Sequence, residues 1–171
     1  MTDTEKGAMT LEEYGDKLIN DDLGKLVESN PYFAFIVLAS AIEFIARCNN
    51  CRESQDIHHA KRISKKVYLK AINTLKSFKK YRQLKEKNGN KLYTLLRCGL
   101  VHTTMPNKGI TLSSEKNELQ NNVVGCMSLY EDVKNAWAEI KADPSILQYL
   151  QTNNGLVISE DLPITTPSSE S

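Results

Sequence analysis

The stretch from Pro31 to Cys48 limits most strongly what this chain can fold into. Asn30-Pro31 predicts a helix start, because an Asn side chain caps free backbone amides and Pro fits the first helical position. Apolar side chains then cover nearly the whole circumference of this helix: Phe33, Phe35, Ile36, Val37, Leu38, Ala41, Ile42, Phe44 and Ile45. A helix that is apolar on all sides belongs at the buried centre of a helical bundle.

The length of 171 residues is that of one domain with a sizeable core. We predict a disordered N-terminus over residues 1–9, a single helical domain over 10–160 and a flexible, Pro/Ser/Thr-rich tail over 161–171. The expected fold class is all-α, an antiparallel helical bundle of about five main helices. We also expect a small β-ribbon near the C-terminal half, in which residues 110–113 pair with residues 156–159.

The remaining helices follow from caps, breaks and periodicity. Thr10-Leu11-Glu12-Glu13 is a capping box that opens the first helix, and Asn20-Asp21-Asp22 predicts a break with a second cap. Asp143-Pro144 predicts the start of a short last helix, which ends at Asn153-Asn154-Gly155. Helical patterns of apolar residues predict the others over about 56–84, 92–102 and 122–141.

The charge of the chain is strongly polarised, although its formal net charge is only +1. The window from Lys61 to Lys91 holds twelve Lys and Arg and one acid, Glu86, so it carries +11 and the remainder carries −10. Basic residues lie opposite the apolar sector of the predicted 56–84 helix: Lys61, Arg62, Lys65, Lys66, Lys70, Lys76, Lys79 and Lys80. They are candidates for binding a nucleic-acid backbone. The alternatives are a solvated face, or a surface that docks on acidic residues of another subunit or protein.

The candidate site lies in the segment Leu92–His102, an apolar helix that carries Arg97 and His102. His titrates near neutral pH and Arg is a fixed fork suited to phosphate, so the pair suits acid/base chemistry beside a bound phosphate. Glu43, on the apolar helix, needs a partner, and Arg97 is the candidate; the pair is either a structural ion pair or part of the polar site. Five residues on an ideal helix leave an offset of about 140°, so a loosened turn or a partner subunit must bring the two groups together.

These residues resemble the HEPN superfamily, whose signature is an Arg followed after four to six residues by a His. The resemblance covers roughly residues 31–141. It implies a homodimeric helical bundle that is either a metal-independent endoribonuclease or an RNA-binding protein. In active members of the family, the resemblance gives Arg97 the role of binding the scissile phosphate and His102 that of general acid or base. Arg52 also matches this signature, with His58 and His59, but it lies in a polar segment, whereas Arg97 lies in an apolar helix where a charge needs a reason.

A second interpretation is a non-catalytic interaction module that binds a protein or nucleic-acid partner through the basic helix. Cys98 supports this interpretation, because it departs from the pattern of active HEPN nucleases, which usually carry a polar residue, often Asn, directly after the Arg. A nucleotide-binding or transferase-associated subunit is a third interpretation, but the sequence has no phosphate loop. The first two interpretations predict RNA or protein partners and no cofactor.

The cysteines and the apolar segments indicate a compartment. Cys48-Asn49-Asn50-Cys51 has zinc-like spacing, with His58, His59, Cys98 and His102 as conceivable completions, but a second pair at matching spacing is missing. We therefore expect reduced, partly buried thiols and no metal. Residues 1–9 lack the apolar core of a signal peptide, and the apolar run over 32–46 is short and interrupted. The expectation is a cytoplasmic protein with no membrane partner.

Overall fold

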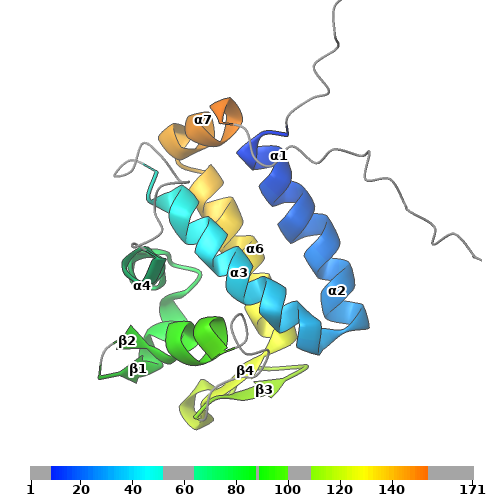
Figure 1. The fold of residues 1–171 in the computed structure, drawn as a ribbon, viewed down its shortest axis with the longest axis vertical. Coiled ribbons are helices and arrows are strands. Elements are labelled where there is room, and N and C mark those ends of the chain that lie inside the picture. Colours follow the sequence, from blue (N-terminus) through cyan, green and yellow to red (C-terminus); the bar gives the residue numbers. More distant parts are fainter. Residues whose placement is uncertain (1–8, 52–63, 88, 100–108, 154–171) are drawn as a thin grey trace, which may run out of the picture.

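A computed structural model describes residues 9–51, 64–87, 89–99 and 109–153 of the chain. These residues are 74% helical and form two small sheets of two strands each (Figure 1). The mostly helical fold class is therefore confirmed. The α-helices within the described ranges are α1 (Leu11–Asp16), α2 (Leu23–Ser29), α3 (Pro31–Asn49), α4 (Ser64–Thr74), α6 (Cys126–Lys141) and α7 (Pro144–Thr152).

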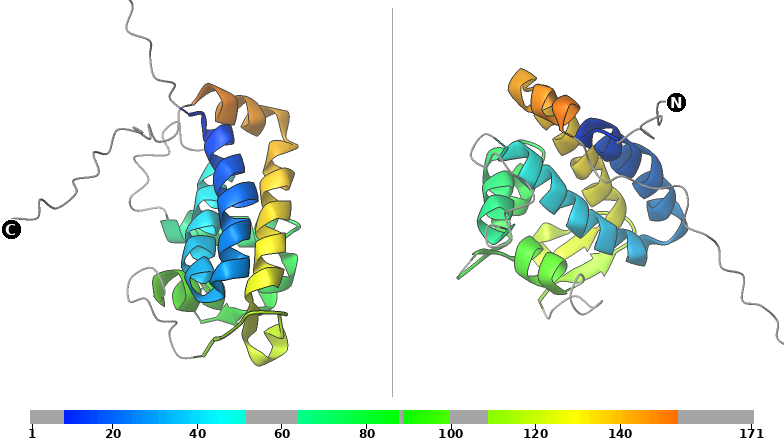
Figure 2. Two further views of the ribbon diagram at one scale, coloured as in Figure 1. Left: turned by 90° about the vertical axis from the view of Figure 1, so that its right-hand side faces the viewer. Right: turned by 45° about the horizontal axis from the view of Figure 1, so that its top comes forward.

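Helix α3 lies at the centre of the fold, as its apolar circumference predicts. It packs against α2, α4 and α6, and its buried side chains include Phe35, Leu38 and Ile42 (Figures 1 and 2). The predicted cap is present, because the Asn30 side chain accepts a hydrogen bond from the backbone N–H of Phe33 at 3.2 Å. Helix α3 has 19 residues, so it is longer than the apolar run over residues 32–46 that the sequence analysis judged too short to span a membrane.

By length and composition alone, α3 is apolar enough to cross a membrane. Half of the residues in its apolar window are buried inside the fold, and the core helix of a soluble protein passes the same test. Length and polarity therefore do not distinguish a membrane-spanning helix from a buried core helix here. Packing of α3 against α2, α4 and α6 is a sufficient reason for its apolar residues.

The N-terminal segment begins as predicted but does not break where expected. The capping box is formed, with the Thr10 hydroxyl accepting from the Glu13 amide and the Glu13 carboxylate accepting from the Thr10 amide. The predicted break at residues 20–22 is wrong, because a π-helical segment, η1 (Lys17–Asp22), joins α1 to α2. The Asp16 carboxylate accepts from the Asn20 amide and also from the Trp137 indole, so local and tertiary bonds hold this turn helical.

The long basic helix predicted over 56–84 is also wrong in its second half. Helix α4 ends at Thr74, and a 3₁₀ helix, η3 (Lys79–Gln83), follows after a turn. The carboxylate of Glu139 on α6 accepts hydrogen bonds from the backbone N–H groups of Lys76 and Ser77, at 2.8 and 3.1 Å. The Arg82 guanidinium donates to backbone carbonyls at the end of α4. These partners replace the helical bonds, so the break is stabilised by tertiary contacts.

A small hairpin leads from η3 to the helix that carries Arg97. Strand β1 (Lys85–Glu86) pairs antiparallel with β2 (Gly89–Asn90). The buried Asn90 side chain donates to the Tyr81 carbonyl and accepts from the Leu92 amide, both at 2.8 Å. The following helix contains a π-helical segment, η4 (Leu92–Arg97), and packs against α3.

A strand forms within residues 110–113 as predicted, whereas its predicted partner, residues 156–159, lies outside the described residues. Strand β3 (Thr111–Ser113) pairs in parallel with β4 (Val123–Gly125), so the helix expected from Asn122 begins at Cys126 instead. A short 3₁₀ helix, η5 (Leu119–Asn121), lies between the strands. Asn122 has a left-handed backbone with φ of 57°, which ends η5 and turns the chain into β4.

The short C-terminal helix predicted to start at Asp143-Pro144 is confirmed. Asp143 caps α7 through the Ser145 amide at 3.0 Å, and Pro144 is its first residue. The strand predicted over 156–159 and the tail over 161–171 lie outside the described residues, as do residues 1–8 of the predicted disordered N-terminus.

Candidate functional site

The site centres on an ion pair between α3 and η4. Arg97 donates from Nε and Nη2 to the same oxygen of Glu43, Oε2, at 2.8 and 2.7 Å. The other oxygen, Oε1, accepts from Arg47 Nη2 at 2.8 Å, one helical turn along α3. The side chains of Glu43 and Arg97 keep 14% and 16% of their accessible surface, so the pair is largely desolvated but still reaches the surface. The structure therefore joins Glu43 and Arg97 as predicted.

The electrostatics of the pair favour full ionisation. Burial alone raises the pKa of Glu43, but the hydrogen bonds from Arg47 and Arg97 outweigh burial and hold that pKa below its ordinary value. Burial lowers the pKa of Arg97, and the Glu43 carboxylate more than compensates, so the net shift of that pKa is upward. A guanidinium held in this way is an oriented, permanent positive charge.

Two tyrosines, Tyr93 and Tyr68, lie next to Arg97, and the sequence analysis did not select either of them as a site residue. The guanidinium lies 5.8 Å from the centroid of the Tyr93 ring, and the Tyr68 ring on α4 meets Tyr93 edge to face at 5.1 Å. The Tyr68 hydroxyl is fully buried and has no hydrogen-bond partner within the described ranges. Burial raises the pKa of Tyr68 well above its ordinary value. Tyr93 and Arg97 are four residues apart in a predicted helix, and this spacing could have predicted the contact between the ring and the guanidinium.

The second residue of the predicted signature, His102, lies outside the described residues. The same holds for Arg52, His58 and His59 of the alternative match. The described helix reaches Gly99, and its π-helical segment covers Leu92–Arg97 and so includes Arg97. A loosened helix is thus present next to Arg97, and π segments occur frequently at functional sites. Cys98 is partly buried beside the pair.

The predicted basic face divides into two separate groups. Lys65 and Lys66 are exposed on α4, and Lys70 donates to the Asn50 side chain at 3.1 Å. Because α4 ends at Thr74, three further candidates lie on the turn and on η3 instead: Lys76, Lys79 and Lys80. One continuous face over the eight candidates is therefore wrong, and Lys61 and Arg62 lie outside the described residues.

The cysteine motif lies in the core. Cys48 and Cys51 are both buried at the end of α3, and burial raises the pKa of the Cys48 thiol. A thiol that resists ionisation is poorly suited to metal binding or redox exchange. Among the residues that the structure describes, no three His, Cys, Asp or Glu side chains gather in a way that would hold a metal ion.

Comparison with known proteins adds no assignment, because no family model, no curated protein and no solved structure matches this chain. The chemistry of the site therefore rests on its own geometry. A fixed guanidinium, oriented by a carboxylate and lying over an aromatic ring, can hold a phosphate oxygen at the surface.

Proposed function

We propose that this protein is a HEPN-like antiparallel helical bundle that acts on RNA as a metal-independent endoribonuclease. The observation that carries the proposal is the ion pair of Arg97 with Glu43 at 2.7 Å. An arginine in an otherwise apolar helix is costly unless its charge is used or paired, and here it is both paired and 16% exposed. The pairing leaves the guanidinium oriented at the surface, where a phosphate can approach it.

The mechanism divides the work between two groups of this chain. Arg97 holds the non-bridging oxygens of the scissile phosphate and stabilises the negative charge that develops there. His102 takes the proton from the 2′-OH as this oxygen bonds to phosphorus, or delivers a proton to the 5′-oxygen as its bond to phosphorus breaks. The products are a 2′,3′-cyclic phosphate and a free 5′-OH. Glu43 is a positioning residue in this proposal, because it contacts Arg97 and acts through it.

We also propose that the active form is a homodimer in the cytoplasm, so that two signatures supply acid and base. Tyr32 and Phe33, at the start of α3, keep 45% and 56% of their surface exposed, with ring centroids 6.1 Å apart. Exposed aromatic side chains of this kind are typical of the centre of an interface. Sedimentation of the wild type and of Phe33→Ser measures this directly: a dimer that the substitution weakens supports the proposal, and a wild type that stays monomeric contradicts it.

The test of the function is cleavage of a mixed-sequence RNA in the presence of EDTA. We expect His102→Ala to lose about 10²-fold or more in rate, because a general acid or base contributes roughly that factor. Arg97→Lys should lose roughly 10²-fold, since a point charge replaces the planar fork. His59→Ala is the matched control and should cleave like the wild type. Equal rates in the wild type and His102→Ala would overturn the proposal, and loss in His59→Ala alone would move the activity to Arg52.

A second candidate function is a non-catalytic interaction module that binds through α4. It is favoured by the exposure of Lys65 and Lys66, neighbours on that helix. Charge reversal of Lys65, Lys66 and Lys70 should then weaken partner binding while substitution of Arg97 and His102 has no effect. Binding that survives the reversal and does not depend on salt would contradict this candidate.

A further inference from the structure

Cations from three elements lie along one stripe of α3, near its C-terminal end. Glu43, Arg47 and Asn50 are four and three residues apart, so their side chains leave the helix on the same face. Arg97 from η4 contacts Glu43 at one end of this stripe. At the other end, Lys70 from α4 donates to the Asn50 side chain at 3.1 Å. Arg47 therefore lies between the two contacts, on a stripe that is roughly 10 Å long.

Glu43 orients two of these cations. Its Oε2 contacts Arg97, and its Oε1 accepts hydrogen bonds from Arg47, at 2.8 Å from Nη2 and 3.3 Å from Nε. One carboxylate carries a single negative charge and here it serves two guanidinium groups, so it cannot neutralise both. The side chain of Arg47 keeps 23% of its surface exposed, more than the 16% of Arg97. Both guanidinium groups are thus held in a fixed orientation and reach the solvent.

Lys66 extends this arrangement on α4. It lies four residues before Lys70, so the two side chains leave α4 on the same face. Lys66 is exposed and forms no ion pair with any residue that the structure describes. We call the four side chains of Arg97, Arg47, Lys70 and Lys66 the α3–α4 cation row.

The shape of the row indicates the class of ligand. A small anion such as free phosphate needs donors that converge on one point, whereas these cations are spread along a line. A line of spaced cations suits a polyanion whose charges repeat along a chain. The aromatic rings next to Arg97, those of Tyr93 and Tyr68, are buried, so they offer no platform for base stacking. The row therefore suits a phosphodiester backbone and does not select a base sequence.

We propose that the α3–α4 cation row binds the backbone of an RNA strand, with Arg97 on the scissile phosphate and the other three cations on neighbouring phosphates. The choice of RNA rests on the proposed function. Arg47 is a binding residue that the sequence analysis did not select, and it connects the Arg97 site with the lysines of α4. The Arg97 site and the exposed face of α4 thus belong to one binding surface.

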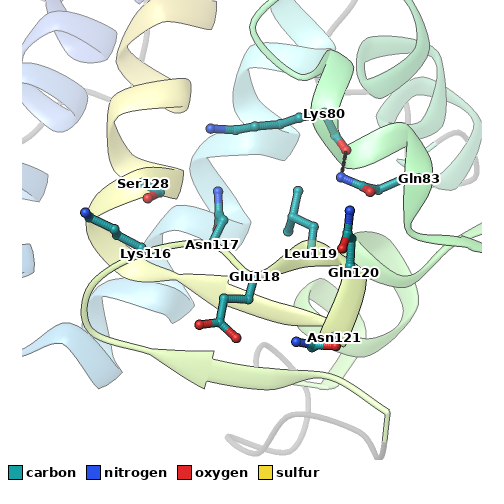
Figure 3. A pocket seen from close by; sticks show the side chains of 9 residues that line it. All are labelled: Lys80, Gln83, Lys116, Asn117, Glu118, Leu119, Gln120, Asn121 and Ser128. Atoms are coloured by element: carbon teal, nitrogen blue, oxygen red, sulfur yellow. Dashed lines mark hydrogen bonds between the residues drawn. The ribbon is translucent and has the colours of Figure 1, made fainter.

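The hollow between η3 and the loop that carries η5 differs from this row in its charge. It has a volume of about 690 Å³, and the residues that line it include Lys80 and Lys116 (Figure 3). The adjoining hollow shares both lysines and is also lined by the carboxylates of Glu115, Glu131 and Asp132. Because carboxylates balance the lysines there, we expect no phosphate binding at this surface. Its exposed Lys116 is therefore a suitable control position.

The test measures binding of a fluorescent 2′-O-methyl RNA strand, which cannot be cleaved because its 2′ oxygen is blocked. Arg47→Gln/Lys66→Gln removes two charges of the row, and the new amide can still donate to Glu43. Lys25→Gln/Lys116→Gln is the matched control, because it removes two charges at exposed lysines that share hollows with carboxylates. We expect the row variant to bind about tenfold more weakly, and the slope of log K against log salt to become shallower by about 1.4, for two lost phosphate contacts. The control should change both quantities far less.

Single variants separate contact with the strand from a purely structural role of Arg47. Arg47→Lys keeps the positive charge and should retain the wild-type slope, whereas Arg47→Gln should make the slope shallower by about 0.7. Urea midpoints of the same variants show how far each substitution destabilises the fold. A lower midpoint in Arg47→Gln with an unchanged slope would mean that Arg47 is only a structural partner of Glu43, and would overturn the inference.

Three other results would also overturn the inference. Equal losses in the row variant and the control would reflect net charge alone. A wild type that binds no strand at low salt would exclude a nucleic-acid backbone as the ligand. Weaker binding in Lys66→Gln together with unchanged binding in Arg47→Gln would confine the contact to α4. Failure of the proposed nuclease shows instead as equal cleavage by the wild type and His102→Ala, a measurement in which the row is intact.

Discussion

Glu43 on α3 contacts Arg97 through one carboxylate oxygen, Oε2, which lies 2.8 Å from Nε and 2.7 Å from Nη2 of the guanidinium. The other oxygen of Glu43 accepts a hydrogen bond from Arg47. One carboxylate therefore fixes two guanidinium groups, one from its own helix and one from a segment 54 residues further along the chain. Because the three side chains are only partly exposed, their interaction is weakly screened by solvent. The central helix thus also orients the proposed phosphate-binding residue.

Replacing Glu43 by Gln should destabilise the fold by about 1–3 kcal/mol, because two partly buried guanidinium groups lose their carboxylate. Urea unfolding measures the change. Glu131→Gln is the matched control: Glu131 is about half exposed and pairs with Lys134 at 3.5 Å, so we expect less than about 0.5 kcal/mol. Similar losses in the two variants would show that the Glu43 pair is no stronger than a surface pair.

The stability of the protein should fall in acid partly through Glu43. Its pKa lies below the ordinary value of 4.5 in the folded state, so between these two values the unfolded chain binds more protons. The contribution of Glu43 is therefore complete above about pH 4.5 and is lost as the pH falls through the folded-state pKa. Urea midpoints of the wild type and Glu43→Gln from pH 6 to pH 3 should converge. A constant difference across this range would refute the linkage.

Tyr68→Phe and Tyr81→Phe should have opposite consequences. The Tyr68 hydroxyl is buried without a partner among the described residues, so its removal should leave stability unchanged or raise it by up to about 1 kcal/mol. The Tyr81 hydroxyl donates to Asp132 and accepts from Asn117, so its removal should cost about 1–3 kcal/mol. Thermal and urea unfolding of both variants provide the comparison. A clear loss in Tyr68→Phe would reveal a bound water or another partner of that hydroxyl.

Glu139→Ala should destabilise the turn after α4 by about 1–3 kcal/mol, since the amides of Lys76 and Ser77 lose their acceptor. Hydrogen exchange at these two amides should accelerate as well, which separates this local effect from general destabilisation. Glu131→Ala, at an exposed position of the same helix, is the control. Unchanged exchange at Lys76 and Ser77 would mean that the Glu139 carboxylate does not stabilise the break.

The amino-acid sequence by itself determined the helical class, the buried α3, the caps at Thr10, Asn30 and Asp143, and the pairing of Glu43 with Arg97. These depend on local spacing, or on the need of a carboxylate among apolar side chains for a partner.

Only the tertiary structure decided where the basic helix ends and which strand pairs with β3. Glu139 lies more than 60 residues from the amides that it binds, and no local pattern at Lys76 reveals such a partner. The same break separates Lys79 and Lys80 from α4, and Lys80 lines a hollow together with Lys116. Local propensity sets which segments are helical, but hydrogen bonds between distant segments set where a helix stops and therefore which charges share a surface.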